Sequence, residues 1–317
     1  MARRRPLRPL RQALETGLLR LVAWIARRMS LEAAGRWGGI LGGIAHRVLA
    51  RRRRIAEENL RAALGLSAEE AARTSRAVFA QLGSSFVEFL ALPGRSAESL
   101  ERRVAFDAGF ERLESHRASG RGLILLTAHY GNWELLGALT ARRIGGVAYI
   151  FPAQSNPGTN ELINAARRRL GIELIPMEQG MRRAMRRLLE GGNVGMLPDQ
   201  DARRLGVHVP FFGRPASTLT GPARLAVRAR CPIFFALLDR VGPARFEART
   251  IAWIEPVAGA EEESEVRRIT GDINVALEHA VRRRPDHWYW IHRRWKTPPP
   301  PDSMPDGAPP AAEISRS

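Results

Sequence analysis

Apolar positions follow two different patterns along the chain. Over about the first hundred residues they recur every three to four positions, the spacing of helices with one buried stripe. The clearest stripe consists of Val78, Leu82, Phe86, Phe89 and Leu90. Ser67 and Glu70 form a capping-box pattern before this stripe, and Pro93-Gly94 predicts the end of the helix. We therefore expect the N-terminal part of the chain to be helical.

From about Val104 the pattern changes to short apolar runs that alternate with helical segments. The run Leu123–Ala128 is almost entirely apolar, as expected of a strand that is buried on both faces. The other expected strands are Val147–Phe151, Glu173–Ile175, Val194–Leu197, Val207–Pro210, Ile233–Leu238 and Phe246–Ile251. The expected helices are Trp133–Arg142, Thr159–Leu170, Met181–Glu190, Thr218–Ala229 and Glu261–Arg283. This alternation predicts an α/β fold with a mainly parallel central sheet flanked by helices.

The N-terminal apolar stretches suit a membrane surface better than a membrane span. Charged side chains cut these stretches, whereas a spanning helix needs about 20 mostly apolar residues. Two interpretations remain, a pair of soluble amphipathic helices and an anchor that lies in the membrane interface. We favour the anchor because the basic run Arg51–Arg54 follows directly and suits lipid phosphates. The expected lipid-facing residues are Leu18, Leu19, Leu21, Val22, Trp24 and Ile25.

Three regions are therefore expected along the 317 residues. Residues 1–50 form a membrane-associating helical region, and residues 51–297 form the α/β domain. Residues 298–317 are rich in proline and polar side chains, which cannot bury enough apolar surface to fold, so we expect a disordered tail.

The charge of the chain widens the range of partners. Fifty basic side chains against 32 acidic ones give a formal charge of +18, and Lys296 is the only lysine. Acidic proteins, anionic lipids and nucleic acids are all eligible partners. The arginines are dispersed and no nucleic-acid-binding motif is present, so a nucleic-acid partner is not expected. A single cysteine, Cys231, excludes an internal disulfide and a multi-cysteine metal site, and we expect no metal or cofactor.

The segment from Thr127 to Glu134 is the strongest candidate for chemistry. In open α/β sheets ligands bind beyond the carboxyl ends of the strands, and His129 follows directly after the most apolar strand. Asn132 is expected to cap the following helix, and Glu134 would lie in its first turn. From there Glu134 could accept a hydrogen bond from the imidazole and stabilise its protonated form. The alternative is a structural histidine beside a helix carboxylate.

The sequence His129-Tyr-Gly-Asn-Trp-Glu134 resembles the signature of the glycerolipid and lipid A acyltransferases. Further segments resemble the late acyltransferases of lipid A biosynthesis, the lauroyl and myristoyl transferases. They are Asn156-Pro157, the stretches 191–201, 209–215 and 218–226, and His292-Arg-Arg-Trp-Lys-Thr297. The resemblance covers about residues 50–297. Phe151-Pro152 stands where family members often carry an Arg-Pro pair.

The resemblance implies transfer of an acyl group from a thioester, typically on acyl-carrier protein, to a hydroxyl of a lipid A precursor. His129 would be the general base and Glu134 its orienting partner, and a base of this kind accelerates attack by an alcohol about 10²–10⁴-fold. No acyl-enzyme is needed, because a thioester already has a good leaving group. The implied location is the cytoplasmic face of the inner membrane.

The resemblance also suggests an acceptor site near a second strand end. Asp199, Gln200 and Asp201 follow the strand at 194–197, and a polar turn that satisfies its own backbone is the alternative. Arginines can hold phosphates of the acceptor or the donor. The candidate substrate-binding residues are Asn132, Asp199, Gln200, Asp201, Arg203, Arg204 and Arg214.

Three other functions remain open. The same motif serves acylation of another anionic glycolipid, such as a phosphatidylinositol mannoside. An arginine-rich nucleic-acid-binding protein is a remote alternative, because only the charge supports it. A non-catalytic lipid-binding homologue is the third, and the presence of both His129 and Glu134 speaks against it.

Overall fold

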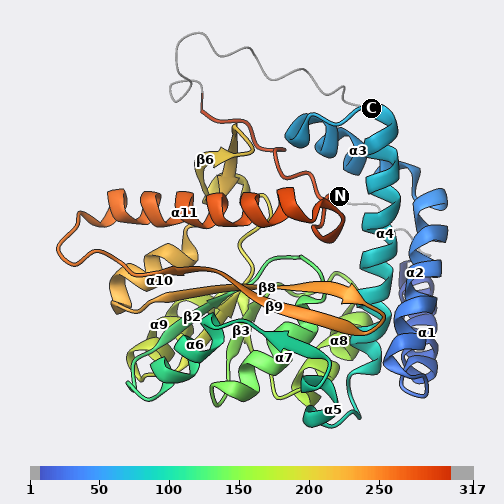
Figure 1. Ribbon diagram of the computed structural model, residues 1–317, viewed down its shortest axis with the longest axis horizontal. Helices are drawn as coiled ribbons and strands as arrows, with labels where there is room; N and C mark the ends of the chain where they lie inside the picture. Colours follow the sequence, from blue (N-terminus) through green and yellow to red (C-terminus); the bar gives the residue numbers. More distant parts are fainter. Residues whose placement is uncertain (1–7, 301–317) are drawn as a thin grey trace.

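The computed structural model describes residues 8–300 and consists of a sheet between two helical layers, with further helices at one end (Figure 1). The N-terminal helices are α1 (Arg8–Ala26), α2 (Leu31–Val48), α3 (Ala50–Leu64), α4 (Ala68–Ala91) and α5 (Ala97–Glu101). The later helices are α6 (Gly109–Arg117), α7 (Trp133–Arg143), α8 (Pro157–Arg169), α9 (Gly180–Leu189), α10 (Gly221–Ala229) and α11 (Glu262–Arg283). Short 3₁₀ turns are η1 (Met177–Gln179), η2 (Arg203–Leu205) and η3 (Pro285–His287).

The central sheet has seven strands in the order β1-β9-β8-β2-β5-β3-β4. They are β1 (Val104–Phe106), β2 (Leu123–Leu126), β3 (Ala148–Phe151), β4 (Glu173–Pro176), β5 (Asn193–Met196), β8 (Ile233–Gly242) and β9 (Arg245–Ile254). The pairs from β8 through β4 are parallel, whereas β9 runs antiparallel to β8 and parallel to β1. The predicted α/β fold with a mainly parallel sheet is confirmed.

Strand β2 lies in the middle of this sheet and is buried on both faces. Leu123 and Leu125 belong to one apolar core with α6, α7 and α8, and Ile124 and Leu126 belong to another with α9, α10 and α11. This alternation follows from the two-residue period of a strand. The prediction from the apolar run is therefore confirmed, and the strand carries residue 129 to the middle of the sheet's carboxyl edge.

One predicted strand lies outside the central sheet. β6 (Val207–Phe211) pairs with β7 (Arg214–Thr218) in a separate antiparallel hairpin. The sequence predicted Thr218 as the start of a helix, which instead begins at Gly221. Phe212 and Gly213 form the turn with positive φ angles, and this tight reversal lets two short strands pair locally rather than join the sheet.

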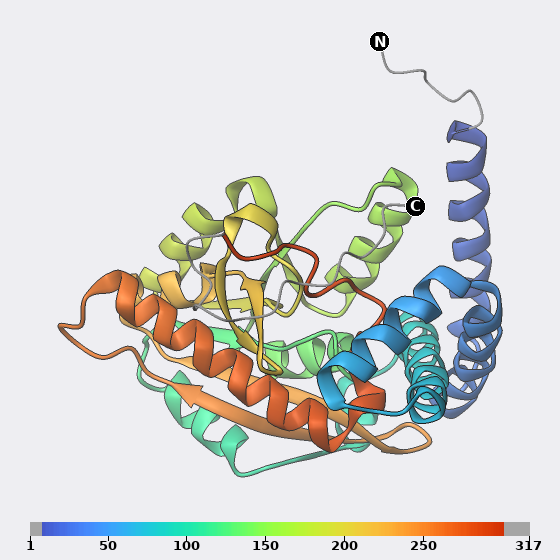
Figure 2. The same cartoon turned by 90° about the horizontal axis from the view of Figure 1, so that it is seen from above.

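The N-terminal helices pack beside the sheet at one end of the molecule (Figures 1 and 2). The predicted capping box of α4 is present, and α4 ends at Ala91, before Pro93-Gly94. Helix α2 approaches α4 so closely that a Cβ on Gly38 would lie 2.3 Å from the carbonyl oxygen of Gly83. Because α2 buries its small-residue face in this way, its large apolar side chains face outward.

No helix between residues 8 and 300 is long and apolar enough to cross a membrane. The division into regions at 50 and 297 stays a prediction. Most of the predicted tail, 301–317, lies outside the described residues.

Candidate active site

The imidazole of His129 lies partly exposed at the carboxyl edge of the sheet. Thr127 and Ala128 continue β2 and are buried, whereas the His129 side chain retains 25% of its exposure. Its ring centroid lies 5.3 Å from that of Trp133 and 5.6 Å from that of Tyr289. The ring is therefore held between aromatic side chains without being sealed in the interior.

Asp199 fixes this imidazole. Its Oδ1 lies 2.8 Å from Nδ1 of His129, and its Oδ2 accepts hydrogen bonds from the backbone N–H of His129 at 2.9 Å and from Nε1 of Trp288 at 3.0 Å. The carboxylate is 2% exposed. Burial alone would raise the pKa of Asp199, but the charge of His129 and the hydrogen bonds from His129 and Trp288 hold it below its ordinary value. An ionised Asp199 therefore accepts a hydrogen bond from Nδ1–H of His129, and this tautomer leaves Nε2 as the proton-accepting nitrogen.

The prediction of a hydrogen bond between His129 and Glu134 is wrong, because Glu134 pairs with another residue. Glu134 lies in the first turn of α7 as expected, but its carboxylate faces α8 and forms a two-point ion pair with Arg167. The distances are 3.1 Å from Nε to Oε2 and 2.5 Å from Nη2 to Oε1. The guanidinium also stacks 3.7 Å from the ring centre of Phe151. The turn between His129 and α7 aims Glu134 along the helix flank, and Asp199 reaches the imidazole from the neighbouring strand.

Asn132 is the N-cap of α7, as predicted. Its Oδ1 accepts a hydrogen bond from the backbone N–H of Leu135, and its Nδ2 donates to Oε2 of Glu88 at 2.8 Å. Glu88 is fully buried in α4 and forms a two-point ion pair with Arg240, both distances being 2.6 Å. This chain of contacts ties the turn behind His129 to the long helix α4.

The remaining predicted residues lie at different distances from the imidazole. Nε2 of Gln200 lies 3.5 Å from both ring nitrogens of His129, which places it against the ring and too far for a good hydrogen bond. Oδ2 of Asp201 accepts a hydrogen bond from Thr297. Arg203 and Arg204 are exposed, and Arg214 lies with its guanidinium 4.9 Å from the ring centre of Trp295. Burial lowers the pKa of Arg214.

Residues 287–297 complete this edge, and sequence reasoning gave them no site role. Gly131 N–H donates to the carbonyl of His287, and Tyr130 pairs with Trp288 across a backbone bridge. Gly131 has a φ of +56°, and a Cβ there would collide with the Leu238 carbonyl, so the turn requires glycine. The aromatic run Trp288-Tyr-Trp290 before His292 is a sequence signal that could have indicated this segment.

His292, which is partly buried, and Arg294, which is buried, add two basic side chains to the same edge. Burial lowers the pKa of His292, against the opposing charges of the nearby carboxylates of Asp199 and Asp201. Burial also lowers the pKa of Arg294, to about 10. Arg294 donates to the Ser217 carbonyl and to Oγ1 of Thr218, both at 2.6 Å, and so anchors the C-terminal segment to β7.

The arrangement suits general base catalysis. An imidazole whose Nδ1 is held by a buried carboxylate, and whose Nε2 has only the long 3.5 Å contact with Gln200, can take a proton from a hydroxyl and return it to a leaving group. Among residues 8–300, no group of three or more histidine, cysteine or acidic side chains is placed to hold a metal ion.

Comparison with known proteins identifies the family. The family model described as bacterial lipid A biosynthesis acyltransferase matches residues 4–297. The chain belongs to this acyltransferase family. The match spans both the α/β core and the N-terminal helices, so the site lies within a lipid A-type acyltransferase fold.

Individual relatives fall into two groups. The chain is 27% identical over 220 residues to a phosphatidylinositol mannoside acyltransferase of Mycobacterium tuberculosis, a match that covers 67% of each protein. It is 27% identical to lipid A biosynthesis acyltransferase 2 of Shigella flexneri, covering 84% of this chain and 82% of the relative. It is 25% identical to the lipid A biosynthesis palmitoleoyltransferase of Escherichia coli, covering 88% of this chain and 90% of the relative.

Proposed function

We propose that the protein transfers a fatty acyl group from an acyl-carrier-protein thioester to a hydroxyl of a lipid A precursor. The observation that carries the proposal is the His129–Asp199 pair, because it leaves a proton-accepting nitrogen at the sheet edge. The near-complete match to the lipid A acyltransferase family and the long alignments to lipid A enzymes support this choice of acceptor.

The reaction needs one base and no covalent intermediate. Nε2 of His129 takes the proton of the acceptor hydroxyl as its oxygen attacks the thioester carbonyl. Asp199 stabilises the imidazolium through the Nδ1–H hydrogen bond. As the tetrahedral intermediate collapses, the carbon–sulfur bond breaks and His129 returns the proton to the leaving thiolate.

Cys231 takes no part in this scheme. Burial raises the pKa of its thiol to about 12, so the thiolate that a covalent mechanism needs is scarce at neutral pH. Cys231 lies just before Pro232 and the start of β8, among apolar core residues.

The other site residues bind substrate or hold the base in position. Gln200, which lies against the imidazole, and Asp201, which accepts a hydrogen bond from Thr297, are proposed acceptor contacts. Arg203 and Arg214 are proposed phosphate ligands, since the guanidinium fork matches phosphate oxygens. Glu134 is proposed to act on the site through Arg167, and Asn132 through the cap of α7.

The outer faces of α1 and α2 are the proposed membrane surface. Both helices expose large apolar side chains, and Arg28 stacks its guanidinium 3.8 Å from the ring centre of Trp24. Such a face enters the acyl boundary while arginines meet headgroup phosphates. We place this surface on the cytoplasmic side of the inner membrane. The exposed residues are Leu10, Leu14, Leu18, Leu21, Trp24, Ile25, Trp37, Ile40, Leu41, Ile44 and Val48, with Leu49 directly after α2. The expectation that Leu19 and Val22 face lipid is wrong, because both pack against the protein core.

A phosphatidylinositol mannoside is the second candidate acceptor. Its support is the similarity to mycobacterial acyltransferases that carry this name. Both acceptors present a sugar hydroxyl and anionic phosphate, which the same base and arginines would serve.

The test is an acyl-transfer assay with the full chain in detergent. Acyl-carrier protein loaded with a radiolabelled acyl group is offered with either a lipid A precursor or a phosphatidylinositol mannoside. Labelled lipid A product is expected, and His129→Ala should lower the rate at least about 10²–10⁴-fold. Thermal unfolding of the variant checks that it folds.

Two outcomes would contradict the proposal. Unchanged turnover in folded His129→Ala removes His129 as the base. Transfer to the mannoside alone would replace the lipid A acceptor with the second candidate.

A further inference from the structure

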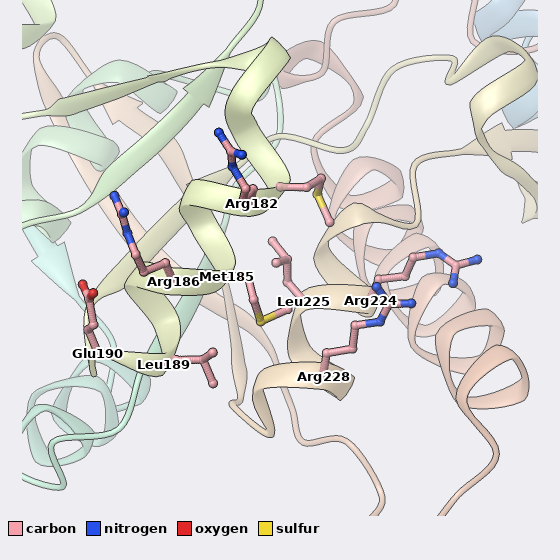
Figure 3. Close-up of a pocket in the computed structure, with 9 residues that line it drawn as sticks. Arg182, Met185, Arg186, Leu189, Glu190, Arg224, Leu225 and Arg228 are labelled. Carbon is pink, nitrogen blue, oxygen red and sulfur yellow. The ribbon is translucent and has the colours of Figure 1, made fainter.

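A groove of about 750 Å³ lies between α9 and α10, apart from the residues of the proposed reaction. In Figure 3 the side chains of Met185 and Leu225 meet between the two helices, and Leu189 extends the apolar lining. Two of the apolar lining residues are open to solvent, since Leu189 is 68% and Met181 43% exposed. The groove is therefore an unfilled apolar surface.

The groove leads to the edge of the sheet that carries His129. Helix α9 follows β4 and precedes β5, and α10 precedes β8, so both begin at the carboxyl edge. At this end a Cβ on Gly221 would lie 3.2 Å from Cε of Met196 and 3.4 Å from Sδ of Met181. Met196 ends β5 and pairs with Leu126 of β2, three residues before His129. The end of the groove at Met181 and Gly221 therefore lies at the same edge of the sheet as the site.

Charge distinguishes the two rims of the groove. On α10, Arg224 and Arg228 are paired with Glu263 and Glu262 at 2.5 and 2.8 Å. On α9, Arg182 and Arg186 are exposed, and neither guanidinium makes a hydrogen bond or ion pair with any residue in the range 8–300. Glu190 is the acidic residue of the lining and comes directly after α9. The free charge on the α9 rim is therefore positive.

An apolar floor beside a positive rim is complementary to an amphipathic helix with acidic side chains along one edge. Helix α9 is about 15 Å long, which matches about three turns of such a helix. We propose that this groove docks an acidic helix of the protein that carries the acyl thioester. The inference rests on the proposed function, because only a carrier-bound donor needs such a surface.

The position of the groove favours a protein from solution over a lipid. Figures 1 and 2 both show α9 and α10 at the end of the molecule opposite to α1 and α2. A chain bound to a membrane through α1 and α2 would keep this groove open to soluble partners. A lipid is the alternative occupant of the groove, and the test below distinguishes it from the carrier helix.

The test compares the double variant Arg182→Glu/Arg186→Glu with wild type in two measurements. Fluorescence anisotropy of labelled holo-acyl-carrier protein reports binding to the full chain without any turnover. We expect the dissociation constant to rise about tenfold or more, because two attractive charges become repulsive. In the transfer assay, KM for the carrier-bound donor should rise by a similar factor, and the rate with acyl-pantetheine should stay unchanged.

The matched control is Arg142→Glu/Arg245→Glu. Both arginines are exposed and have no ion pair within the described part of the chain. The control should bind the carrier as wild type does, and thermal unfolding checks both variants. A carrier variant with lysines in its acidic helix should bind the α9 variant more tightly than it binds the wild-type chain.

The anisotropy result decides the inference even if no acyl transfer is detected. Equal carrier binding by wild type and the α9 variant overturns it, and so does the absence of carrier binding to wild type. If the α9 variant loses binding to anionic vesicles but still binds the carrier, the groove is a lipid site, and this result also overturns the inference.

Discussion

At the carboxyl edge of the sheet and where α4 meets it, charged side chains are buried, whereas on α1 and α2 large apolar side chains are exposed. Asp199 and Glu88 lie in the interior with partners for both carboxylate oxygens. In contrast, Trp37 and Ile44 of α2 face outward, and glycines face the protein. Charged side chains are ordinarily exposed and large apolar side chains ordinarily buried, so each region reverses one half of this rule.

The difference separates two needs of a lipid-modifying enzyme. Buried charges cost free energy unless they are paired, so their presence at one edge indicates a site that must hold one geometry. Exposed apolar surface is costly in water but favourable in lipid. On the proposed function, the first region serves the chemistry and the second contacts the membrane.

The largest effect is expected from Asp199→Asn. The amide no longer stabilises the imidazolium and permits the wrong tautomer, so kcat should fall about 10²–10⁴-fold. The measurement is the transfer assay with lipid A precursor. Glu265→Gln is the control, because it also removes a buried carboxylate but one that pairs with Arg268. Equal losses in the two variants would contradict the assignment of Asp199.

Acid unfolding provides a second readout for this variant. The pKa of Asp199 is lowered in the folded chain, so the unfolded state takes up its proton first as the pH falls. The stabilisation is therefore complete above the unfolded pKa of about 3.9 and is lost as the pH drops through the folded value. The free energy of unfolding should decrease less below about pH 5 in Asp199→Asn than in wild type.

A smaller effect is expected from Trp37→Glu/Ile44→Glu on the outer face of α2. Each substitution replaces a side chain whose burial in lipid contributes about 1.5–3 kcal/mol, so binding to anionic vesicles should weaken at least about tenfold. Co-sedimentation measures it, and catalysis with a detergent-dispersed acceptor should persist.

The matched control for the membrane variant is Val257→Glu/Val275→Glu. Both valines are more than half exposed and belong neither to α1 nor to α2. Sedimentation of the α2 variant at wild-type levels, or an equal loss in the valine variant, would exclude α2 as the contact with the membrane.

The smallest effect on turnover is expected from Glu134→Gln. Arg167 keeps a neutral acceptor, so the free energy of unfolding should fall by about 1–3 kcal/mol and kcat less than about tenfold. Urea unfolding and the transfer assay measure these changes. A drop in kcat as large as that of Asp199→Asn, in a folded variant, would return Glu134 to the role predicted from the sequence.

Much of the fold follows from local pattern. The capping box at Ser67, the apolar run at 123–128 and the late helix all appear where the sequence indicates them. These features depend on neighbours within a few residues, which the sequence displays directly. The hairpin β6–β7 was missed as a separate unit because a short strand carries no signal of which sheet it joins.

The candidate site divides in the same way. The sequence by itself determined that His129 follows a buried strand, that Asn132 caps the next helix and that Glu134 lies in its first turn. Only the tertiary structure decided that Asp199, 70 residues later, meets the imidazole, and that Arg167 takes Glu134. The physical reason is that strand order sets which loops become neighbours at a sheet edge. β2 lies beside β5, and this pairing is written in no local spacing of residues.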